Sequence, residues 1–214
     1  NFNRAIALSY LPINKERLVE AYDLRGHTKI LLKRYTEVIE DATKAIDLNP
    51  DEPTHFKLRG CAYHHLNIQK KAIEDVNKAI DLNPNEPQHF NLRGWAYYKL
   101  GKEDKAIEDA TKAIDLDPNE PNHFRIRGWA YYFLKDFKKA EEDANKSIDL
   151  NPDDSDHYNL RGWAYHKLGK EDKAIKDATK AIDLNPDDPD HFNLRGDAYF
   201  HLKDYKKVVE DANK

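Results

Sequence analysis

The chain has 214 residues, of which 39% are hydrophobic and 35% are charged, and its formal net charge is −4. This weak acidity gives no basic footprint for nucleic acid or for an anionic membrane surface, and no apolar run is long enough to span a bilayer. The single cysteine, Cys61, excludes an internal disulfide. The chain starts at Asn1 and contains no methionine, so we expect it to be a piece of a longer protein.

The first element, residues 1–18, is predicted to be a degenerate helix that precedes a repeat array. Its stretch NRAIALSY resembles the second helix of the units that follow, but Pro12 interrupts the match. Further along, the dipeptide Arg-Gly recurs every 34 residues, and two series of prolines keep the same period. The glycines of these dipeptides are Gly26, Gly60, Gly94, Gly128, Gly162 and Gly196. The period predicts five complete units and a partial sixth, over residues 19–52, 53–86, 87–120, 121–154, 155–188 and 189–214.

Each unit is predicted to hold two helices joined by a short turn. We number the positions of a unit so that the glycine of Arg-Gly is position 8. Helix A begins at position 1, where a proline suits the first helical turn, and runs to a leucine at position 14. Gly101 and Gly169 at position 15 predict a left-handed C-cap. Helix B follows and stops before Asn-Pro or Asp-Pro, because the residue before a proline is pushed out of the α region.

The apolar side of helix B and the repeated glycine predict how the two helices pack. In the third unit, Ala106, Ala110, Ala113 and Ile114 form one apolar stripe. A glycine inside helix A costs about 1 kcal/mol relative to alanine, so its recurrence indicates a steric reason. We expect it to let helix B approach closely at position 20, which is Ala72, Ala106, Ala140 or Ala174 in four of the units.

These units resemble the tetratricopeptide repeat. The matching residues of the third unit are Gly94, Tyr97, Ala106, Ala113 and Pro118, at positions 8, 11, 20, 27 and 32. The first unit departs with Lys29 and Val38 at positions 11 and 20, and the fourth with Ser147 at position 27. The resemblance implies an all-α fold, a right-handed superhelical solenoid of stacked helix-turn-helix units whose A helices line the concave face. It also implies a non-catalytic scaffold for protein–protein interaction, with no cofactor.

All three tryptophans, Trp95, Trp129 and Trp163, stand at position 9 of helix A. We predict that helix A packs through positions 4, 8, 11 and 14, which places position 9 on the opposite side together with positions 2, 5, 12 and 13. Two interpretations remain open. The indoles pack on neighbouring A helices and stiffen the stack, or they form the aromatic floor of a groove that binds a ligand.

The function predicted here is a scaffold that holds an extended peptide of a partner protein in this groove. Asparagines at position 5 can pair with a peptide backbone through one amide, and Lys99, Arg125 and Lys167 add positive charge beside the indoles. At roughly 8–10 Å per unit and about 3.3 Å per extended residue, each unit spans about three ligand residues. The predicted groove residues are Asn91, Trp95, Tyr98, Lys99, Arg125, Trp129, Tyr132, Phe133, Asn159, Trp163, His166, Lys167 and Asn193.

A structural role is the main alternative, in which the open ends or the outer face of the array join it to other subunits. Solenoids need polar caps at their ends, and the sequence shows no evident cap at its C-terminal end. We expect a protein or peptide partner rather than nucleic acid or a membrane, and a cytoplasmic location.

Several motifs that imitate chemical sites are expected to be structural. The carboxylate clamp of this family needs lysine at position 5 and asparagine at position 9, and only Lys57 matches, followed by Cys61. The stretch DLNPDDSD lacks the glycine and the bidentate acid of a calcium loop. Cys61 has His64 nearby but no third orienting group, so we expect no catalytic site. Five histidines at position 3 stand too far apart to share a metal ion and should pack at helix starts: His55, His89, His123, His157 and His191.

Opposite charges at positions 7 and 23 predict a repeated ion pair between helices A and B. Position 7 is arginine in all six units: Arg25, Arg59, Arg93, Arg127, Arg161 and Arg195. Position 23 is always aspartate: Asp41, Asp75, Asp109, Asp143, Asp177 and Asp211. We expect each guanidinium group to lie within about 4 Å of the carboxylate of its own unit.

Overall fold

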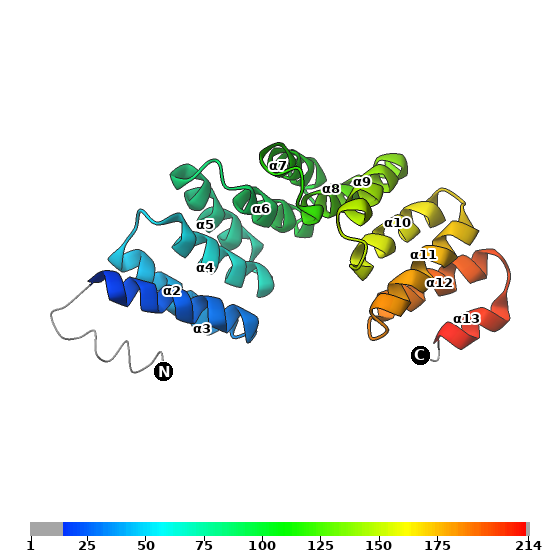
Figure 1. The fold of residues 1–214 in the computed structure, drawn as a ribbon, viewed down its shortest axis with the longest axis horizontal. Coiled ribbons are helices and arrows are strands. Elements are labelled where there is room, and N and C mark those ends of the chain that lie inside the picture. The colour runs from blue at the N-terminus through cyan, green and yellow to red at the C-terminus, as the bar shows by residue number, and fades with distance from the viewer. Residues whose placement is uncertain (1–14, 213–214) are drawn as a thin grey trace. The chain divides into compact units, whose positions relative to one another are not determined.

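The computed structural model describes residues 15–212, and the regular structure in that range is entirely α-helical (Figure 1). The A helices are α2 (Lys15–Leu31), α4 (Pro53–His65), α6 (Pro87–Lys99), α8 (Pro121–Phe133), α10 (Ser155–Lys167) and α12 (Pro189–His201). The B helices are α3 (Tyr35–Leu48), α5 (Gln69–Leu82), α7 (Glu103–Leu116), α9 (Phe137–Leu150), α11 (Glu171–Leu184) and α13 (Tyr205–Ala212). The all-α class and the stacked helix pairs are therefore confirmed. The element predicted over 1–18 lies, up to residue 14, outside the described residues. None of the helices in 15–212 is both long and apolar enough to cross a membrane.

The helices form two compact units that divide after Lys102. Within each unit consecutive helices pack side by side, so an inner A helix such as α4 or α10 contacts the B helix before it and the B helix after it. Neighbouring A helices of a unit also touch, as α4 and α6 do, and as α10 does with α8 and α12. Among the described residues of each unit the B helices make no such contact with one another, so the A helices lie closer together. The handedness of the superhelix is a property of the whole array and stays a prediction.

The start of each A helix follows from its first residue and from an acidic N-cap. The four prolines at position 1 are the first residues of their helices. Before α4, Glu52 Oε1 accepts a hydrogen bond from the backbone N–H of Thr54 at 3.2 Å, which satisfies one of the free N–H groups of the first turn. The first unit has Val19 instead of proline at position 1, and α2 runs through this position, since Lys15 to Leu18 are also helical.

The turn from helix A to helix B depends on one residue with positive φ at position 15. Gly101 and Gly169 have φ of 65° and 71°, as predicted. The same left-handed conformation occurs without glycine at Lys33, Asn67, Lys135 and Lys203. The geometry of the turn is thus kept even where a side chain makes it unfavourable, at a cost of roughly 1–2 kcal/mol per residue.

The buried face of helix A is wider than predicted, and the prediction was wrong at position 14. The leucines there are exposed in several units, with Leu134 at 46%. Positions 3, 6 and 10 are buried instead in most units, and Leu160 and Ala164 have no exposed surface; the first unit is the exception, with Leu24 51% exposed. The physical reason is that an inner A helix packs between two B helices and beside its A neighbours, rather than on its own B helix alone.

Position 8 is a point of close approach between helices, as predicted. A Cβ atom at Gly60 would lie 2.9 Å from Val76 Cγ2 and 3.3 Å from the carbonyl oxygen of Ala72 at position 20. At Gly162 a Cβ atom would also meet the next A helix, at 2.5 Å from Leu194 Cδ2. The glycine therefore leaves room for two neighbours, the B helix of its own unit and the A helix of the next.

The apolar stripe of helix B is also confirmed, because Ala106, Ala110 and Ala113 have no exposed surface. The first and fourth units have another residue than alanine at position 20 or 27 and still bury that residue on the same face of helix B. Val38 is completely buried at position 20 of the first unit, and Ser147 at position 27 of the fourth donates its hydroxyl to a carbonyl of its own helix at 3.0 Å.

The predicted ion pair joins helices A and B in five of the six repeats. Arg59 donates through Nε and Nη2 to both carboxylate oxygens of Asp75, at 2.7 and 2.8 Å. Arg127 and Asp143 form the same two-pronged contact, at 2.9 and 2.8 Å. The other pairs are Arg25 with Asp41, Arg161 with Asp177 and Arg195 with Asp211. Arg93 and Asp109 lie in different compact units, and their pair stays a prediction.

The position-3 histidines are buried at helix starts, as predicted, with exposed fractions of at most 2%. His55 and His157 each donate Nδ1–H to the carbonyl of the C-cap residue of the preceding B helix, Asn49 and Asn151, at 3.1 Å. In the stretch that imitates a calcium loop, Asp154 is the N-cap of α10. The packing role expected for the histidines is confirmed, and the stretch that imitates a calcium loop starts a helix.

Replacing Gly60 with alanine should lower the thermal midpoint of unfolding. The new methyl group would press on Val76, whose branched side chain is stiff in a helix, and on a backbone carbonyl; such overpacking costs about 1–3 kcal/mol. Gly196→Ala is the matched control, because no described atom lies within 4 Å of its Cβ position, and alanine there gains up to about 1 kcal/mol of helix propensity. Thermal melts followed by circular dichroism compare the two, and equal shifts would contradict the packing described.

Removing one partner of an ion pair between helices A and B should lower the free energy of unfolding. The side chains of Arg127 and Asp143 are largely buried, and loss of one member of a buried pair costs roughly 3–5 kcal/mol, so we expect Asp143→Ala to lower the free energy of unfolding by about 2–3 kcal/mol. Asp149→Ala, at an exposed position of the same helix, should stay within about 0.5 kcal/mol. Urea denaturation measures both. A cost for Asp143→Ala no larger than that of Asp149→Ala would refute the stabilising role of the pair.

Candidate functional site

The three tryptophans lie on α6, α8 and α10, and each indole keeps part of its surface exposed. Each also meets, edge to face, the ring three residues further along its helix, where helical geometry places a neighbour. The ring centroids are 5.5 Å apart for Trp95 and Tyr98 and 5.8 Å apart for Trp163 and His166. Positions 9 and 12 therefore form a connected strip along each of these helices.

The strip on α8 continues into a larger aromatic patch, made of Trp129, Tyr132 and Phe133. Trp129 and Phe133 both contact Tyr132, with centroids 5.5 Å apart, and Phe137 of α9 lies equally close to Tyr132 on another side. Phe133 is 53% exposed. Burial raises the pKa of the Tyr132 hydroxyl, and the negative charge of Asp197 on α12 adds to the effect. The aromatic patch thus shares its environment with position 9 of the last A helix.

The asparagines at position 5 lie at different depths. Asn193 is exposed, Asn91 is partly buried and Asn159 is buried. The side-chain oxygens of Asn91 and Asn159 are shielded from solvent and accept no hydrogen bond from the described part of the chain. Burial of an acceptor without a donor costs free energy, so a ligand N–H group that reached either amide would be favoured.

Position 5 of α8 is Arg125, and its guanidinium group already has protein partners. It forms an ion pair with Asp156 of α10, and Nη2 donates to Asn122 Oδ1 at 2.7 Å. A ligand carboxylate would have to compete with Asp156 for this charge.

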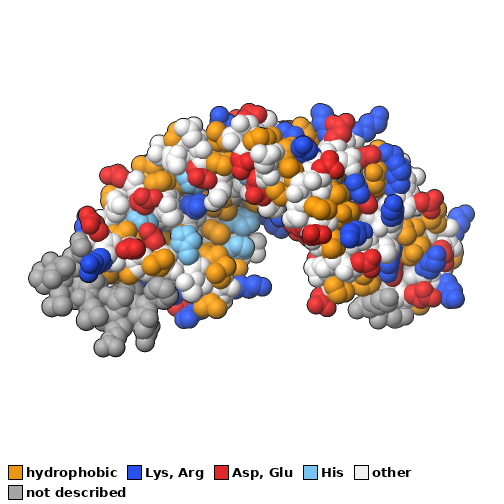
Figure 2. Space-filling model, viewed as in Figure 1, with side chains coloured by type: hydrophobic (Ala, Val, Ile, Leu, Met, Phe, Trp, Pro, Cys, Tyr) orange, Lys and Arg blue, Asp and Glu red, His pale blue; other side chains and the backbone are white. Residues whose placement is uncertain are grey.

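The lysines at position 13 are more accessible. Lys99 and Lys167 are exposed, and each Nζ lies 5.9 Å from an aromatic centroid, that of Tyr98 and of Trp163 respectively. His166, also predicted to line the groove, is buried and offers little surface to a ligand. Elsewhere on the face shown in Figure 2, acidic and basic side chains are interspersed around apolar patches, and no single sign of charge dominates.

The predicted groove residues fall into two groups. The first group lies on α6 in the first compact unit and consists of Asn91, Trp95, Tyr98 and Lys99. The second group lies on α8, α10 and α12 in the second compact unit. The contacts between these side chains run along single helices: Trp95 with Tyr98 on α6, Trp129 with Tyr132 and Phe133 on α8, and Trp163 with His166 on α10. A continuous groove through both groups stays a prediction.

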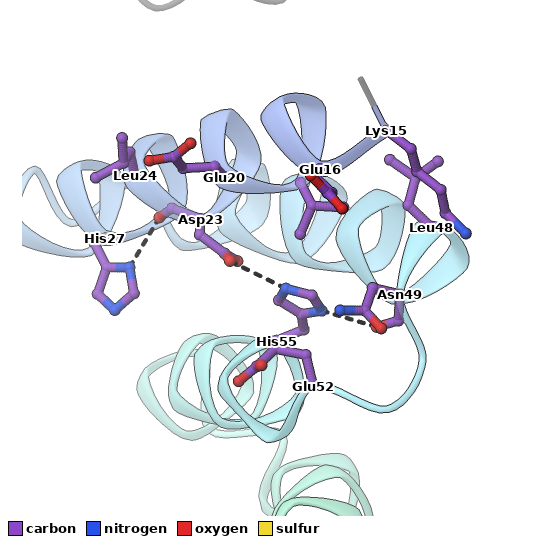
Figure 3. A pocket seen from close by; sticks show the side chains of 11 residues that line it. Lys15, Glu16, Glu20, Asp23, Leu24, His27, Leu48, Asn49, Glu52 and His55 are labelled. Atoms are coloured by element: carbon purple, nitrogen blue, oxygen red, sulfur yellow. Dashed lines mark hydrogen bonds and ion pairs between the residues drawn. The ribbon is translucent and has the colours of Figure 1, made fainter. Parts of the chain in front are cut away.

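A separate hollow of about 570 Å³ lies in the first unit, between α2, the end of α3 and the start of α4 (Figure 3). Figure 3 shows His55 pointing toward Asp23, and His55 Nε2 lies 3.1 Å from Asp23 Oδ2. Burial lowers the pKa of His55, but the hydrogen bond and charge of Asp23 outweigh it, and the net pKa is raised. The acids that line the hollow are Glu16, Glu20, Asp23 and Glu52.

This acidic lining suits a lysine or arginine side chain. The hollow has little signature in the sequence, because its lining comes from three different helices. The one available signal was Asp23, the only acid at position 5 among the six units.

Cys61 shows no sign of an activated nucleophile. Burial raises the pKa of its thiol, which favours the protonated form. Its neighbour His64 donates Nδ1–H to Gln69 Oε1 at 3.0 Å, and burial lowers the pKa of this histidine. Cys61 and His64 therefore behave as packed residues of a helix surface.

Sequence models of the tetratricopeptide repeat match most of the chain. The matched segments are 87–120, 155–188, 124–154, 19–52 and 58–86. Among proteins with curated descriptions, none matches this sequence.

Solved structures show the same architecture. TTC0263, a thermophilic TPR protein of Thermus thermophilus, superposes with a TM-score of 0.73 at 20% identity, over 85% of this chain and 99% of its own. The type IV pilus biogenesis factor PilW gives a TM-score of 0.83 at 16% identity, over 90% of each chain. The first TPR of Spaghetti (RPAP3), bound to the HSP90 peptide SRMEEVD, shares 33% identity with a TM-score of 0.53, over 55% of this chain and 94% of its own.

Proposed function

Because this chain belongs to the tetratricopeptide repeat family, we propose that it is a scaffold that binds an extended peptide of a partner protein on the tryptophan side of its A helices. Proteins of this family generally mediate protein–protein interactions and are typically non-catalytic. The proposal includes a non-catalytic role and a cytoplasmic location. The observation that carries it is the aromatic patch on α8.

The aromatic patch is a surface whose burial would release free energy. Trp129 is partly exposed, and Phe133 beside it is more than half exposed. Apolar area removed from water contributes about 25 cal/mol per Å², and rigid aromatic side chains are enriched among residues that dominate binding energy. Leucine, phenylalanine or tyrosine side chains of a peptide would cover this surface.

Asparagine amides and lysines define the rest of the proposed ligand. An extended backbone lying across α10 can donate an N–H group to Asn159, whose oxygen has no donor among the described residues. Lys167, exposed beside Trp163, favours an acidic residue in the peptide. We therefore propose a peptide of about nine residues for the three tryptophan-bearing units, from the advance of about 3.3 Å per residue.

The ligand proposed here differs from the peptide that the 33% identical relative holds. That peptide, SRMEEVD, is acidic, and the present chain also offers lysines. However, Lys57, the residue that matches the carboxylate clamp, donates to Gln88 Oε1 at 3.1 Å, and Cys61 replaces the asparagine of the clamp. The proposal therefore assigns the main anchoring role to aromatic contacts and a secondary role to charge.

Self-association is the second candidate. Phe200 and Tyr205, on α12 and α13, are exposed and in contact with each other, with centroids 5.7 Å apart. A small hollow lies beside Phe192 and Gly196, between α12 and α13. Analytical ultracentrifugation at several concentrations separates the candidates, since end-to-end growth favours assembly and a constant monomer mass favours peptide binding.

Peptides selected from a random dodecamer library should carry aromatic or large apolar residues together with acids, and their binding should quench tryptophan fluorescence. Trp129→Ala should weaken the selected peptide by about 2 kcal/mol, roughly 30-fold, which is typical of a central aromatic anchor. Fluorescence titration of the remaining tryptophans, supported by calorimetry, gives the affinities.

Tyr205→Ala serves as the control for this measurement, because Tyr205 is an exposed aromatic residue on a B helix. It should leave the affinity unchanged. The proposal fails if Trp129→Ala binds the selected peptides as tightly as the unaltered chain, or if Tyr205→Ala weakens them to the same extent.

A further inference from the structure

Three side chains from three successive helices meet in the second compact unit: His166 of α10, Glu171 of α11 and His201 of α12. His166 Nδ1 lies 2.8 Å from Glu171 Oε2, and His201 Nδ1 lies 3.3 Å from Glu171 Oε1. The two imidazole rings are 4.7 Å apart at their centroids and inclined by 66°. One potential ligand atom from each residue lies within 4.8 Å of the other two. We propose that these three residues form a binding site for Zn²⁺.

The donor set has the composition that zinc uses in open sites. Two imidazole nitrogens and one carboxylate oxygen are a known three-ligand set for Zn²⁺, with water in the fourth position. Bonds of about 2.0–2.1 Å in a tetrahedron place ligand atoms about 3.3 Å from one another. His166 lies 2.8 Å from one carboxylate oxygen of Glu171 and His201 lies 3.3 Å from the other, and one ligand atom from each residue lies within 4.8 Å of the other two, somewhat wider than that value. Small rotations of Glu171 and His201 would therefore complete the geometry.

The burial of the three side chains suits entry of an ion from solvent. The side chains of His166 and Glu171 are 5% and 10% exposed, whereas that of His201 is 59% exposed. Two ligands are thus held in place by packing, and the third can swing to admit the ion. Loss of side-chain freedom on binding is then confined mainly to His201.

The charges around the cluster leave its carboxylate in need of a cation. The ion-pair partners of Glu171 among the described residues are the two histidines. The nearby amine of Lys170 is directed to Glu141, at 2.7 Å, and that of Lys167 lies over Trp163. A largely buried carboxylate whose described ion-pair partners are imidazoles gains a full counter-charge from a divalent ion.

The first compact unit contains side chains in the same arrangement, but without the carboxylate and the second histidine that zinc would need. At the same positions 12 and 17, His64 Nδ1 lies 3.0 Å from Gln69 Oε1, so an amide replaces the carboxylate. Position 13 of the next A helix is Lys99 instead of histidine. The full set of two histidines and one acid at these positions therefore distinguishes the cluster at α10–α12, and His64 supplies a matched control within the same chain.

Calorimetric titration of the metal-free chain with ZnCl₂ tests the site. We expect one tight site per chain, and the intense visible absorption of four-coordinate Co²⁺ when cobalt is titrated instead. Glu171→Gln and His201→Ala should each weaken zinc by more than about 100-fold, since even loss of an outer-shell partner costs about 10–100-fold. His64→Ala should leave the affinity unchanged.

Thermal unfolding provides a second readout. Zinc should raise the midpoint of the unaltered chain and of His64→Ala, because a ligand that binds only the folded state stabilises it, and should not raise that of Glu171→Gln. Circular dichroism verifies that the variants fold, and the exposed position of His201 makes His201→Ala a safe second test. The site is refuted if no stoichiometric zinc binds, or if binding persists in both Glu171→Gln and His201→Ala.

Discussion

At the Arg-Gly dipeptides of α4, α8 and α10, two contacts at adjacent positions hold helix A against helix B. The glycine admits the backbone of helix B, as Gly60 does with the carbonyl of Ala72, and the arginine before it binds both carboxylate oxygens of an aspartate, as Arg59 does with Asp75. A helix held at two neighbouring positions has both its distance and its rotation fixed. Helical geometry then predicts that the residue that follows, at position 9, points away from helix B, and Trp129 at this position is partly exposed.

The two sides of helix A differ in how much they vary within the chain. Positions 7 and 8 are arginine and glycine in every unit, whereas position 9 is histidine, cysteine, tryptophan or aspartate. A constant framework thus presents chemically different surfaces on adjacent helices. In the second unit these surfaces are the aromatic patch of α8 and, next to it, the histidine and acid cluster of α10, α11 and α12. His166 belongs to that cluster and contacts Trp163, so zinc and peptide would bind close together.

Much of the fold could be predicted from the sequence, because each device recurs with the period and acts locally. The ion pairs, the prolines at helix starts and the glycine contacts are examples. The failures have specific physical causes. Helix α2 runs through position 1, where Val19 replaces the proline of other units, and Lys135 takes a left-handed conformation that its residue type does not favour. Two contacts at the candidate site depend on distances between different helices, which the spacing along one helix cannot give. They are the ion pair of Arg125 with Asp156 and the contact of His166 with Glu171.

The most direct test of the central claim, that the tryptophan side of the A helices binds the partner peptide, is a nuclear magnetic resonance titration of the ¹⁵N-labelled chain. The three indole N–H groups give separate signals that report on Trp95, Trp129 and Trp163. On addition of a selected peptide, we expect the Trp129 and Trp163 signals to shift along with the side-chain amide of Asn159, while backbone amides on the exposed side of α9 and α11 stay in place. Shifts confined to α9 and α11, with all three indole signals unchanged, would contradict the account.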